Sequence, residues 1–315
     1  MHVIDAERTH ALLDYPGLVE ALRDLFRRGV DRIDRAFLDQ PLPNGESNNW
    51  LILPAWQFGR NFGAKLVSVF PGNASKGKEV ILGIYALFDG ETGEPLAVID
   101  GAALTVRKTA ANSALAATYL ARDDTRRMAM VGAGAMAPHL IMAHCAVRPI
   151  REVKVWNRTP QRARRLAADL KIDGVQIEAA ENLEAAARWG DLISCATMAT
   201  KPVIKGTWLK PGTHLDLVGS YRPDMREADD DAVKRAKRHY IDTRITTIGV
   251  SGDITDPINA GLIDPAALID TGQLARGEKP GRVSPDEITF FKSGGGGHED
   301  LGTAQYLLSK LQSAD

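Results

Sequence analysis

Residues 131–137, VGAGAMA, combine small residues that permit a tight turn with the start of a helical pattern. Gly132 and Gly134 occupy the first two positions of the GxGxxG/A pattern, and Ala137 occupies the third. Such glycines let the backbone approach a pyrophosphate at the amino end of a helix. A glycine turn alone is common, but here an apolar strand precedes it and a second strand, VKVWN, follows the helix. This context predicts a dinucleotide site that also includes Ala135 and Met136.

The end of the second strand indicates which dinucleotide binds. An NAD site usually carries Asp or Glu there, which bonds the adenosine ribose. In this chain Asn157 is followed by Arg158 and Thr159, with Arg162 one turn further on. A carboxylate would repel a 2′-phosphate, whereas guanidinium groups bind it bidentately. The sequence therefore predicts NADPH, with NADH less favoured; the alternative is that the arginines of 158–165 are only a solvated helix face.

Two later strand ends complete the expected cofactor site. Thr197 follows the strand in DLISCAT, and Val218 and Gly219 end the strand in HLDLVGS. We expect Thr197 to line the cofactor near the nicotinamide ribose, because ligands of such sheets bind at the carboxyl ends of the strands. The alternative is an ordinary threonine at a strand end.

Two cations stand where an anion could bind. Arg107 follows Thr105, a plausible N-cap of the alanine-rich helix expected over 104–122. A cation in a first turn opposes the helix dipole, whereas arginine with free helix N–H groups makes a good carboxylate site. The alternative is an arginine paired with a nearby acid. Lys65 is the one charge within AKLVSVF, and its alternative is an edge-strand lysine that faces solvent.

Other catalytic patterns are missing from the sequence. His139 and His144 are five apart, so they do not share a helix face as two zinc ligands at i and i+4 would. No GxSxG nucleophile turn occurs. We expect neither a metal site nor a serine nucleophile.

These residues must be positioned by two domains. Strands and helices alternate from Asp123 onward, which is typical of a doubly wound, Rossmann-type parallel sheet over 123–298. Before it, a helix over 15–29 and strands at 64–70, 80–89 and 96–100 predict an α/β domain over 1–122 with an antiparallel or mixed sheet. We expect the last helix, about 299–315, to pack back on this first domain.

Composition restricts the partners. The formal net charge is −1, which argues against a general nucleic-acid or membrane surface. The N-terminus carries two acids and no apolar core, unlike a signal peptide, and no run approaches the ~18 apolar residues of a membrane span. Two distant cysteines, Cys145 and Cys195, favour reduced thiols and a cytoplasmic protein.

Five blocks together resemble the ornithine cyclodeaminase/μ-crystallin family: GAKLVSVFPGN, LTVRKTAANSALAATYLAR, VGAGAMA, KPGTHLDLVGS and ITFFKSGGGGHEDLGTA. The resemblance runs from about Leu51 onward. It implies a homodimer with the substrate held between an N-terminal α/β domain and the Rossmann domain. It also implies that Lys65 and Arg107 are catalytic residues that hold the substrate carboxylate and neighbouring groups. Ser293 and Gly294 are further expected substrate contacts.

The chain departs from the cyclodeaminase pattern. Tyr221 stands where those enzymes carry an aspartate, and Met225 stands at their lysine position. Ornithine cyclisation needs a base at the substrate amine, so this loss argues against deamination. The family's N-terminal arginine has no secure match, with Arg35 as a candidate.

The details WNRTP, SCATMAT and GSYRPDMREAD resemble instead the ketimine-reductase branch, which reduces Δ1-pyrroline-2-carboxylate, and often its piperideine homologue, to L-proline and L-pipecolate. A cyclic imine can take its proton from solvent, so the cyclodeaminase acid can be absent. Asp224 is a candidate local acid or a simple turn residue. The alternatives are a cyclodeaminase-type lyase and a non-catalytic NADPH or small-ligand binding protein; alanine dehydrogenase and opine-type condensation also occur in the family.

Overall fold

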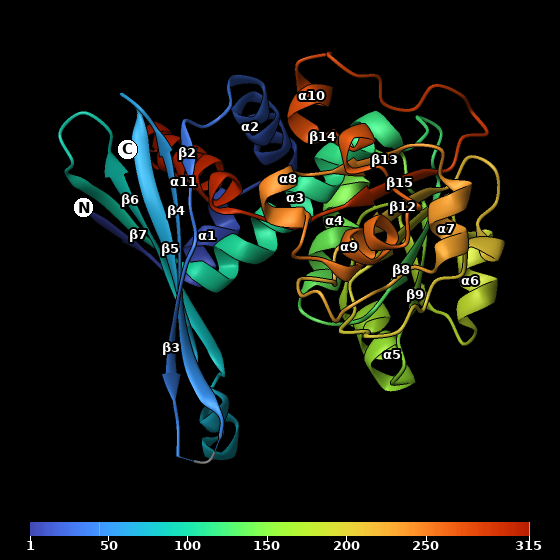
Figure 1. The fold of residues 1–315 in the computed structure, drawn as a ribbon, viewed down its shortest axis with the longest axis horizontal. Coiled ribbons are helices and arrows are strands. Elements are labelled where there is room, and N and C mark those ends of the chain that lie inside the picture. Colours follow the sequence, from blue (N-terminus) through green and yellow to red (C-terminus); the bar gives the residue numbers. More distant parts are fainter. Residues whose placement is uncertain (44, 315) are drawn as a thin grey trace. The chain divides into compact units, whose positions relative to one another are not determined.

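The computed structural model describes residues 1–43 and 45–314 and divides into two compact units (Figure 1). Unit 1 is Met1–Thr109 with Gly296–Asp315, and unit 2 is Ala110–Gly295. The sequence placed the first boundary at 122/123, whereas the units divide within helix α3 (Gly101–Leu120). One continuous helix thus begins in unit 1 and continues into unit 2, a division that composition does not reveal.

Unit 1 is built on a mixed seven-stranded sheet of order β1-β7-β6-β5-β4-β2, with β3 also paired to β4. Among the described residues, β1 and β7 pair in parallel and the other pairings are antiparallel, so the expected mixed sheet is confirmed. Its strands are β1 (His2–Ile4), β2 (Arg32–Ile33), β3 (Ala36–Pro41), β4 (Ser47–Gln57), β5 (Asn61–Val69), β6 (Ile81–Asp89) and β7 (Pro95–Asp100).

Unit 1 also contains helices α1 (Ala6–Leu12), α2 (Tyr15–Arg28) and α11 (Gly297–Ala314), together with the first part of α3. Helix α2 begins after Asp14, whose side chain accepts a hydrogen bond from the Gly17 amide, and ends at Gly29 with φ of 79°. Its expected apolar stripe is buried: Leu18, Leu22, Leu25 and Phe26. The C-terminal helix α11 packs against α2, β4 and β5.

Unit 2 contains an eight-stranded parallel sheet of order β10-β9-β8-β11-β12-β15-β13-β14. The strands are β8 (Arg127–Val131), β9 (Glu152–Trp156), β10 (Gln176–Ala179), β11 (Leu192–Cys195), β12 (His214–Leu217), β13 (His239–Ile241), β14 (Ile269–Asp270) and β15 (Thr289–Lys292). The chain order reverses between β8 and β11, which is where doubly wound sheets bind ligands. The expected Rossmann-type fold is confirmed.

Helices flank this sheet on both faces (Figure 1). They are α4 (Met136–Val147), α5 (Pro160–Asp169), α6 (Leu183–Trp189), α7 (Asp230–Arg235), α8 (Arg244–Thr247), α9 (Gly252–Asn259), α10 (Thr271–Ala275) and the second half of α3. Ile193, Leu215 and Phe290 lie in the core cluster between strands and helices. Among the described residues, no helix is both long and apolar enough to cross a membrane.

Candidate functional site

The glycine turn of unit 2 joins β8 to α4. Gly132 has φ of 109°, and a Cβ there would lie 2.4 Å from the Ala196 carbonyl oxygen, so only glycine fits. A Cβ at Gly134 would meet nothing within 4 Å. Helix α4 then begins after Ala135, which makes no side-chain cap, and Met136 and Ala137 form its first turn. The turn therefore presents open space and a helix amino end, which suit a pyrophosphate.

Asn157 connects this turn to the one after β9. Its Oδ1 accepts a hydrogen bond from the Ala133 amide at 3.1 Å, and its Nδ2 donates to the Thr159 carbonyl at 2.9 Å. An aspartate could make the first bond but not the second. Asn157 therefore shapes both turns while adding no negative charge.

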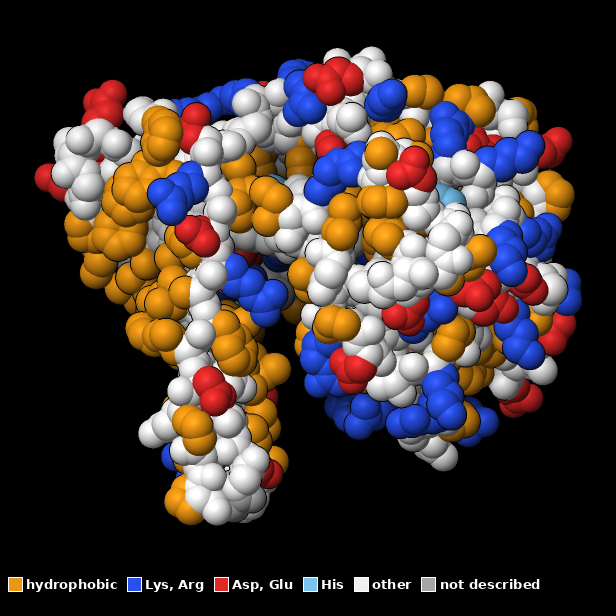
Figure 2. Space-filling view, in the orientation of Figure 1, with side chains coloured by type: hydrophobic (Ala, Val, Ile, Leu, Met, Phe, Trp, Pro, Cys, Tyr) orange, Lys and Arg blue, Asp and Glu red, His pale blue; other side chains and the backbone are white. Residues whose placement is uncertain are grey.

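Arg158 and Arg162 are exposed at the start of α5, and neither forms an ion pair with another described residue. By contrast, Arg164 and Arg165 lie near Glu181 and Asp169. Figure 2 shows Lys and Arg side chains gathered over the part of unit 2 that carries α5. Two free guanidinium groups beside an amide, with no carboxylate, fit a 2′-phosphate.

Thr197 and Gly219 lie at the ends of neighbouring strands β11 and β12. The Val218 amide donates to the Cys195 carbonyl at 2.8 Å, which continues the pairing of the two strands. A Cβ on Gly219 would lie 2.1 Å from the Thr197 carbonyl oxygen, so the two turns touch through their backbones. The predicted residues of these strand ends are thus brought together.

In unit 1, Lys65 is buried on β5, an interior strand, so the solvent-facing alternative is wrong. Its Nζ lies 2.9 Å from Asp300 Oδ2, near the start of α11, and 3.5 Å from Thr105 Oγ1. Burial lowers the pKa of Lys65, and the Asp300 charge opposes this shift. Burial alone would raise the pKa of Asp300, but the charges of Lys108 and Lys65 outweigh it and hold that pKa below its usual value.

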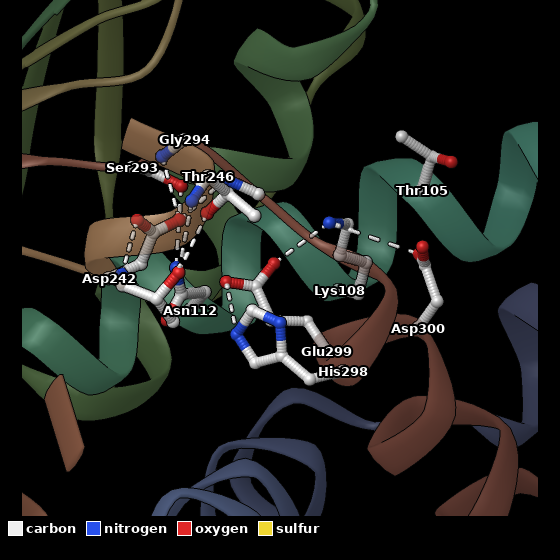
Figure 3. A network of polar contacts seen from close by, with 12 residues as sticks. Thr105, Lys108, Asn112, Asp242, Thr246, Ser293, Gly294, His298, Glu299 and Asp300 are labelled. Carbon is white, nitrogen blue, oxygen red and sulfur yellow. Dashed lines mark hydrogen bonds and ion pairs between the residues drawn. The ribbon is translucent and has the colours of Figure 1, made fainter. Parts of the chain in front are cut away.

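A second buried pair lies beside the first. Lys108 Nζ donates to Glu299 Oε2 at 2.8 Å and lies 3.9 Å from Asp300 Oδ1 (Figure 3). Two lysines and two carboxylates therefore balance one another inside unit 1. Sequence reasoning missed Lys108, Glu299 and Asp300; the available signals were a second cation beside Arg107 and the acids directly after the glycine run.

Arg107 lies in the second turn of α3, not the first. The helix begins at Gly101, where Asp100 Oδ1 accepts from the Ala103 amide, while Thr105 Oγ1 donates to the Gly101 carbonyl. The expectation that Thr105 is the N-cap is therefore wrong, because Asp100 caps the helix one turn earlier. Arg107 therefore does not oppose the helix dipole in the first turn.

The surroundings of Arg107 contain no carboxylate partner among the described residues. Its Nε and Nη2 donate to His10 Nδ1 and to the His10 carbonyl at 3.1 and 2.9 Å, and its guanidinium lies 4.8 Å from the centre of the Tyr15 ring. Burial and the Arg107 charge lower the pKa of His10, so the neutral ring accepts this bond. These contacts orient the guanidinium without neutralising it, which leaves its charge for an anion.

Side chains of unit 2 hold the backbone of Gly294 and Gly295 in place. The amides of Gly294 and Gly295 both donate to Asp242 Oδ2, and Asn112 Nδ2 donates to Ser293 Oγ at 3.3 Å (Figure 3). A Cβ on Gly294 would lie 2.6 Å from the Thr246 carbonyl oxygen. Asp242, which sequence reasoning also missed, thereby fixes the backbone at Gly294 and Gly295.

The remaining candidates lie at the surface. Tyr221 is 48% exposed, and exposed Asp224 is bonded to Arg222 at 3.0 and 3.1 Å. Arg35 is exposed between β2 and β3. No cluster of three or more His, Cys, Asp or Glu side chains in the described ranges could hold a metal ion.

Known proteins share this chain's sequence and fold. The ornithine cyclodeaminase/mu-crystallin family profile matches residues 23–315. The Delta(1)-pyrroline-2-carboxylate reductase of Paracoccus denitrificans is 42% identical over 94% of this chain and 92% of its own. The Thermococcus litoralis enzyme of that name, solved with NADH and L-proline, superposes with a TM-score of 0.89 at 30% identity, covering 100% and 98% of the two chains. An archaeal alanine dehydrogenase dimer with bound NAD superposes with a TM-score of 0.87 at 27% identity, covering 100% of this chain and 97% of its own. The chain belongs to the ornithine cyclodeaminase/mu-crystallin family.

Proposed function

We propose that the protein reduces a cyclic ketimine carboxylate, Δ1-pyrroline-2-carboxylate or its piperideine homologue, to the cyclic L-amino acid with NADPH. The observation that carries the choice is Tyr221. Ornithine cyclodeamination needs a carboxylate at this position, and the chain has an exposed phenol there. Reduction of a cyclic imine needs no such base. The relatives named as reductases support the same reaction.

The substrate carboxylate binds Arg107, whose guanidinium is oriented by His10 and Tyr15 but not neutralised. Lys65, held by Asp300, adds a second positive charge at the carboxylate and ring nitrogen. Ser293 and Gly294 are further proposed contacts of the ring. The two cations lower the energy of the bound anion, and their fixed positions orient the C=N bond.

The proton that the nitrogen needs comes from solvent before hydride transfer, because an iminium is the better hydride acceptor. This explains how the chain can dispense with an acid at position 221.

NADPH, when bound, supplies the hydride to the carbon of the C=N bond. Gly132, Gly134, Ala135, Met136 and Ala137 hold its pyrophosphate, and Asn157, Arg158, Thr159 and Arg162 hold its 2′-phosphorylated ribose. Thr197, Val218 and Gly219 line the nicotinamide end.

The experiment that tests the function follows NADPH absorbance after adding Δ1-pyrroline-2-carboxylate to the purified protein, with NADH in parallel. We expect rapid loss with NADPH and slow loss with NADH. Release of ammonia from L-ornithine without net cofactor consumption would instead identify a lyase. Tight NADPH binding without turnover of any imine would identify a binding protein.

The uncovered face of the unit 1 sheet supports a homodimer. It carries exposed large apolar side chains, which Figure 2 shows gathered over the strands. They include Trp50, Trp56, Leu82 and Ile84, on β4 and β6. A patch of this kind marks a protein interface, and the alanine dehydrogenase neighbour is a dimer. Light scattering should find monomers for Trp56→Asp. The control Val283→Asp, at an exposed residue of unit 2, should remain a dimer.

A further inference from the structure

Glu227 is a fully buried carboxylate that joins two turns of unit 2. Its Oε1 accepts hydrogen bonds from the Thr197 amide at 2.7 Å and from Thr197 Oγ1 at 2.8 Å. Its Oε2 accepts from the Gly219 amide at 2.7 Å. One side chain therefore holds the residues that follow β11 and β12.

These two turns lie at the edge of the unit 2 sheet where the strands end, and they occupy one half of the proposed cofactor site. Strands β11 and β12 are parallel, with Cys195 paired to Leu217, so their carboxyl ends lie together. They lie on the far side of the switch point from the strands that carry Gly132 and Asn157. In a sheet made of two mononucleotide-binding halves, the second half holds the nicotinamide end.

Titratable and charged groups on several elements surround Glu227. Asp253, on α9, accepts from the Glu227 and Ala228 amides at 2.8 and 3.1 Å. Lys292 on β15 and the Cys195 thiol on β11 also lie beside these two carboxylates. The positive charge of Arg226 opposes the rise in the pKa of Asp253 that burial causes. Burial and then the Asp253 charge raise the pKa of Glu227 to about 7, against the opposing effects of Lys292 and the Thr197 bonds.

We propose that ionised Glu227 is a positioning residue for the nicotinamide half of the cofactor, acting through Thr197 and Gly219. The Thr197 and Gly219 amides can only donate, and an ionised carboxylate accepts from both of them and from the Thr197 hydroxyl. A protonated carboxyl has lost the charge that strengthens these bonds, and its O–H either faces an amide donor or reverses the bond to the Thr197 hydroxyl. The proposal rests on the proposed cofactor, and it predicts that affinity for the nicotinamide half falls as pH decreases through about 7.

The test compares two ligands on the folded protein. NADPH reaches both halves of the site, whereas adenosine 2′,5′-bisphosphate reaches only the adenosine half. Glu227→Gln keeps an acceptor for Thr197 but turns an N–H toward the Gly219 amide. We expect its Kd for NADPH to rise ~10-fold, the effect of a lost charge-assisted bond. Its Kd for the bisphosphate should not change. Arg158→Ala is the matched control, because it should weaken both ligands.

The pH profile separates positioning from a general structural role. The bisphosphate shares the 2′-phosphate of NADPH but adds a 5′-phosphate that titrates at about pH 6, so the ratio of NADPH to bisphosphate affinity in Glu227→Gln is the baseline. In the wild type this ratio should fall below that baseline as pH decreases through about 7. In Asp253→Asn the same fall should come at lower pH, because the like charge that raises the Glu227 pKa is gone.

Equal weakening of both ligands by Glu227→Gln, or unchanged NADPH binding, would overturn the proposal. If that variant does not fold, Thr197→Val removes one donor and should weaken NADPH alone, about fivefold; no loss there would overturn it as well. A wild type that prefers NADH would refute only the cofactor choice. The same comparison would then use NADH and ADP-ribose.

Discussion

Asp300 Oδ2 lies 2.9 Å from the Nζ of Lys65, and both side chains are buried in unit 1. The pair joins an interior strand of the sheet to the C-terminal helix, so this helix supplies the charged partner of Lys65. Asp300 holds the ammonium charge of Lys65 against the burial that would remove its proton.

Replacing Asp300 with asparagine should therefore lower kcat/KM and move its alkaline limb to lower pH. Burial already lowers the pKa of Lys65, and the Asp300 charge raises it; without that charge, Lys65 loses its proton at a lower pH. The measurement is kcat/KM against pH for both proteins. Asp169→Asn, which removes an exposed acid near Arg165, is the control and should leave the profile unchanged. An unshifted limb in Asp300→Asn would show that Lys65 charge does not govern the reaction.

Replacing Arg107 with alanine should raise KM for the imine strongly. The loss in kcat/KM should correspond to about 2–3 kcal/mol, because a charge-assisted bond to the carboxylate is lost. Steady-state kinetics with NADPH saturating would measure it. Arg122→Ala, which breaks an ion pair with Asp124 in unit 2, is the matched control. Unchanged kcat/KM in Arg107→Ala would remove this residue from the site.

Replacing Asn157 with aspartate should reverse the cofactor preference. The new carboxylate keeps the acceptor for the Ala133 amide, but it loses the bond to the Thr159 carbonyl and repels a 2′-phosphate. The ratio of kcat/KM for NADPH to that for NADH should fall about tenfold or more. Arg158→Ala should lower the NADPH value alone, and Arg165→Ala should change neither. A ratio that Asn157→Asp leaves intact would contradict the assignment of the 2′-phosphate to this turn.

The parts of the site that follow from local chain geometry could be predicted from sequence. A glycine turn between a strand and a helix forms from neighbouring residues, so Gly132 and the Asn157 turn were found from their spacing. The doubly wound sheet followed in the same way from alternating apolar segments. Lys65 was predicted because its charge conflicts with its apolar surroundings, whereas the reason given for Arg107, a place in the first turn of its helix, is wrong.

The carboxylates could not be predicted, because their significance comes only from tertiary contact. Glu299 and Asp300 look like ordinary acids in the first turn of a helix, which the helix dipole favours anyway. Nothing near them in the sequence indicates that Lys65 and Lys108 lie against them. Glu227 likewise follows a surface turn, and its burial depends on strands and a helix brought together from distant segments.

Protonation of His214 should make the stability of unit 2 depend on pH. His214 is fully buried on β12, where Nδ1 lies 2.9 Å from Thr289 Oγ1. Burial, above all, lowers its pKa to about 3 from 6.5, although the Asp216 charge opposes the shift. Between these values the unfolded chain binds one more proton at this histidine than the folded chain does. The free energy of unfolding should therefore decrease as pH falls below about 6.5, by roughly 1.4 kcal/mol per pH unit from this site. His214→Asn can keep a polar atom near Thr289 but does not titrate in this range. Urea unfolding at several pH values between 5 and 7 should give a shallower decline for the variant, and equal slopes would mean that the folded protein accepts the proton at His214.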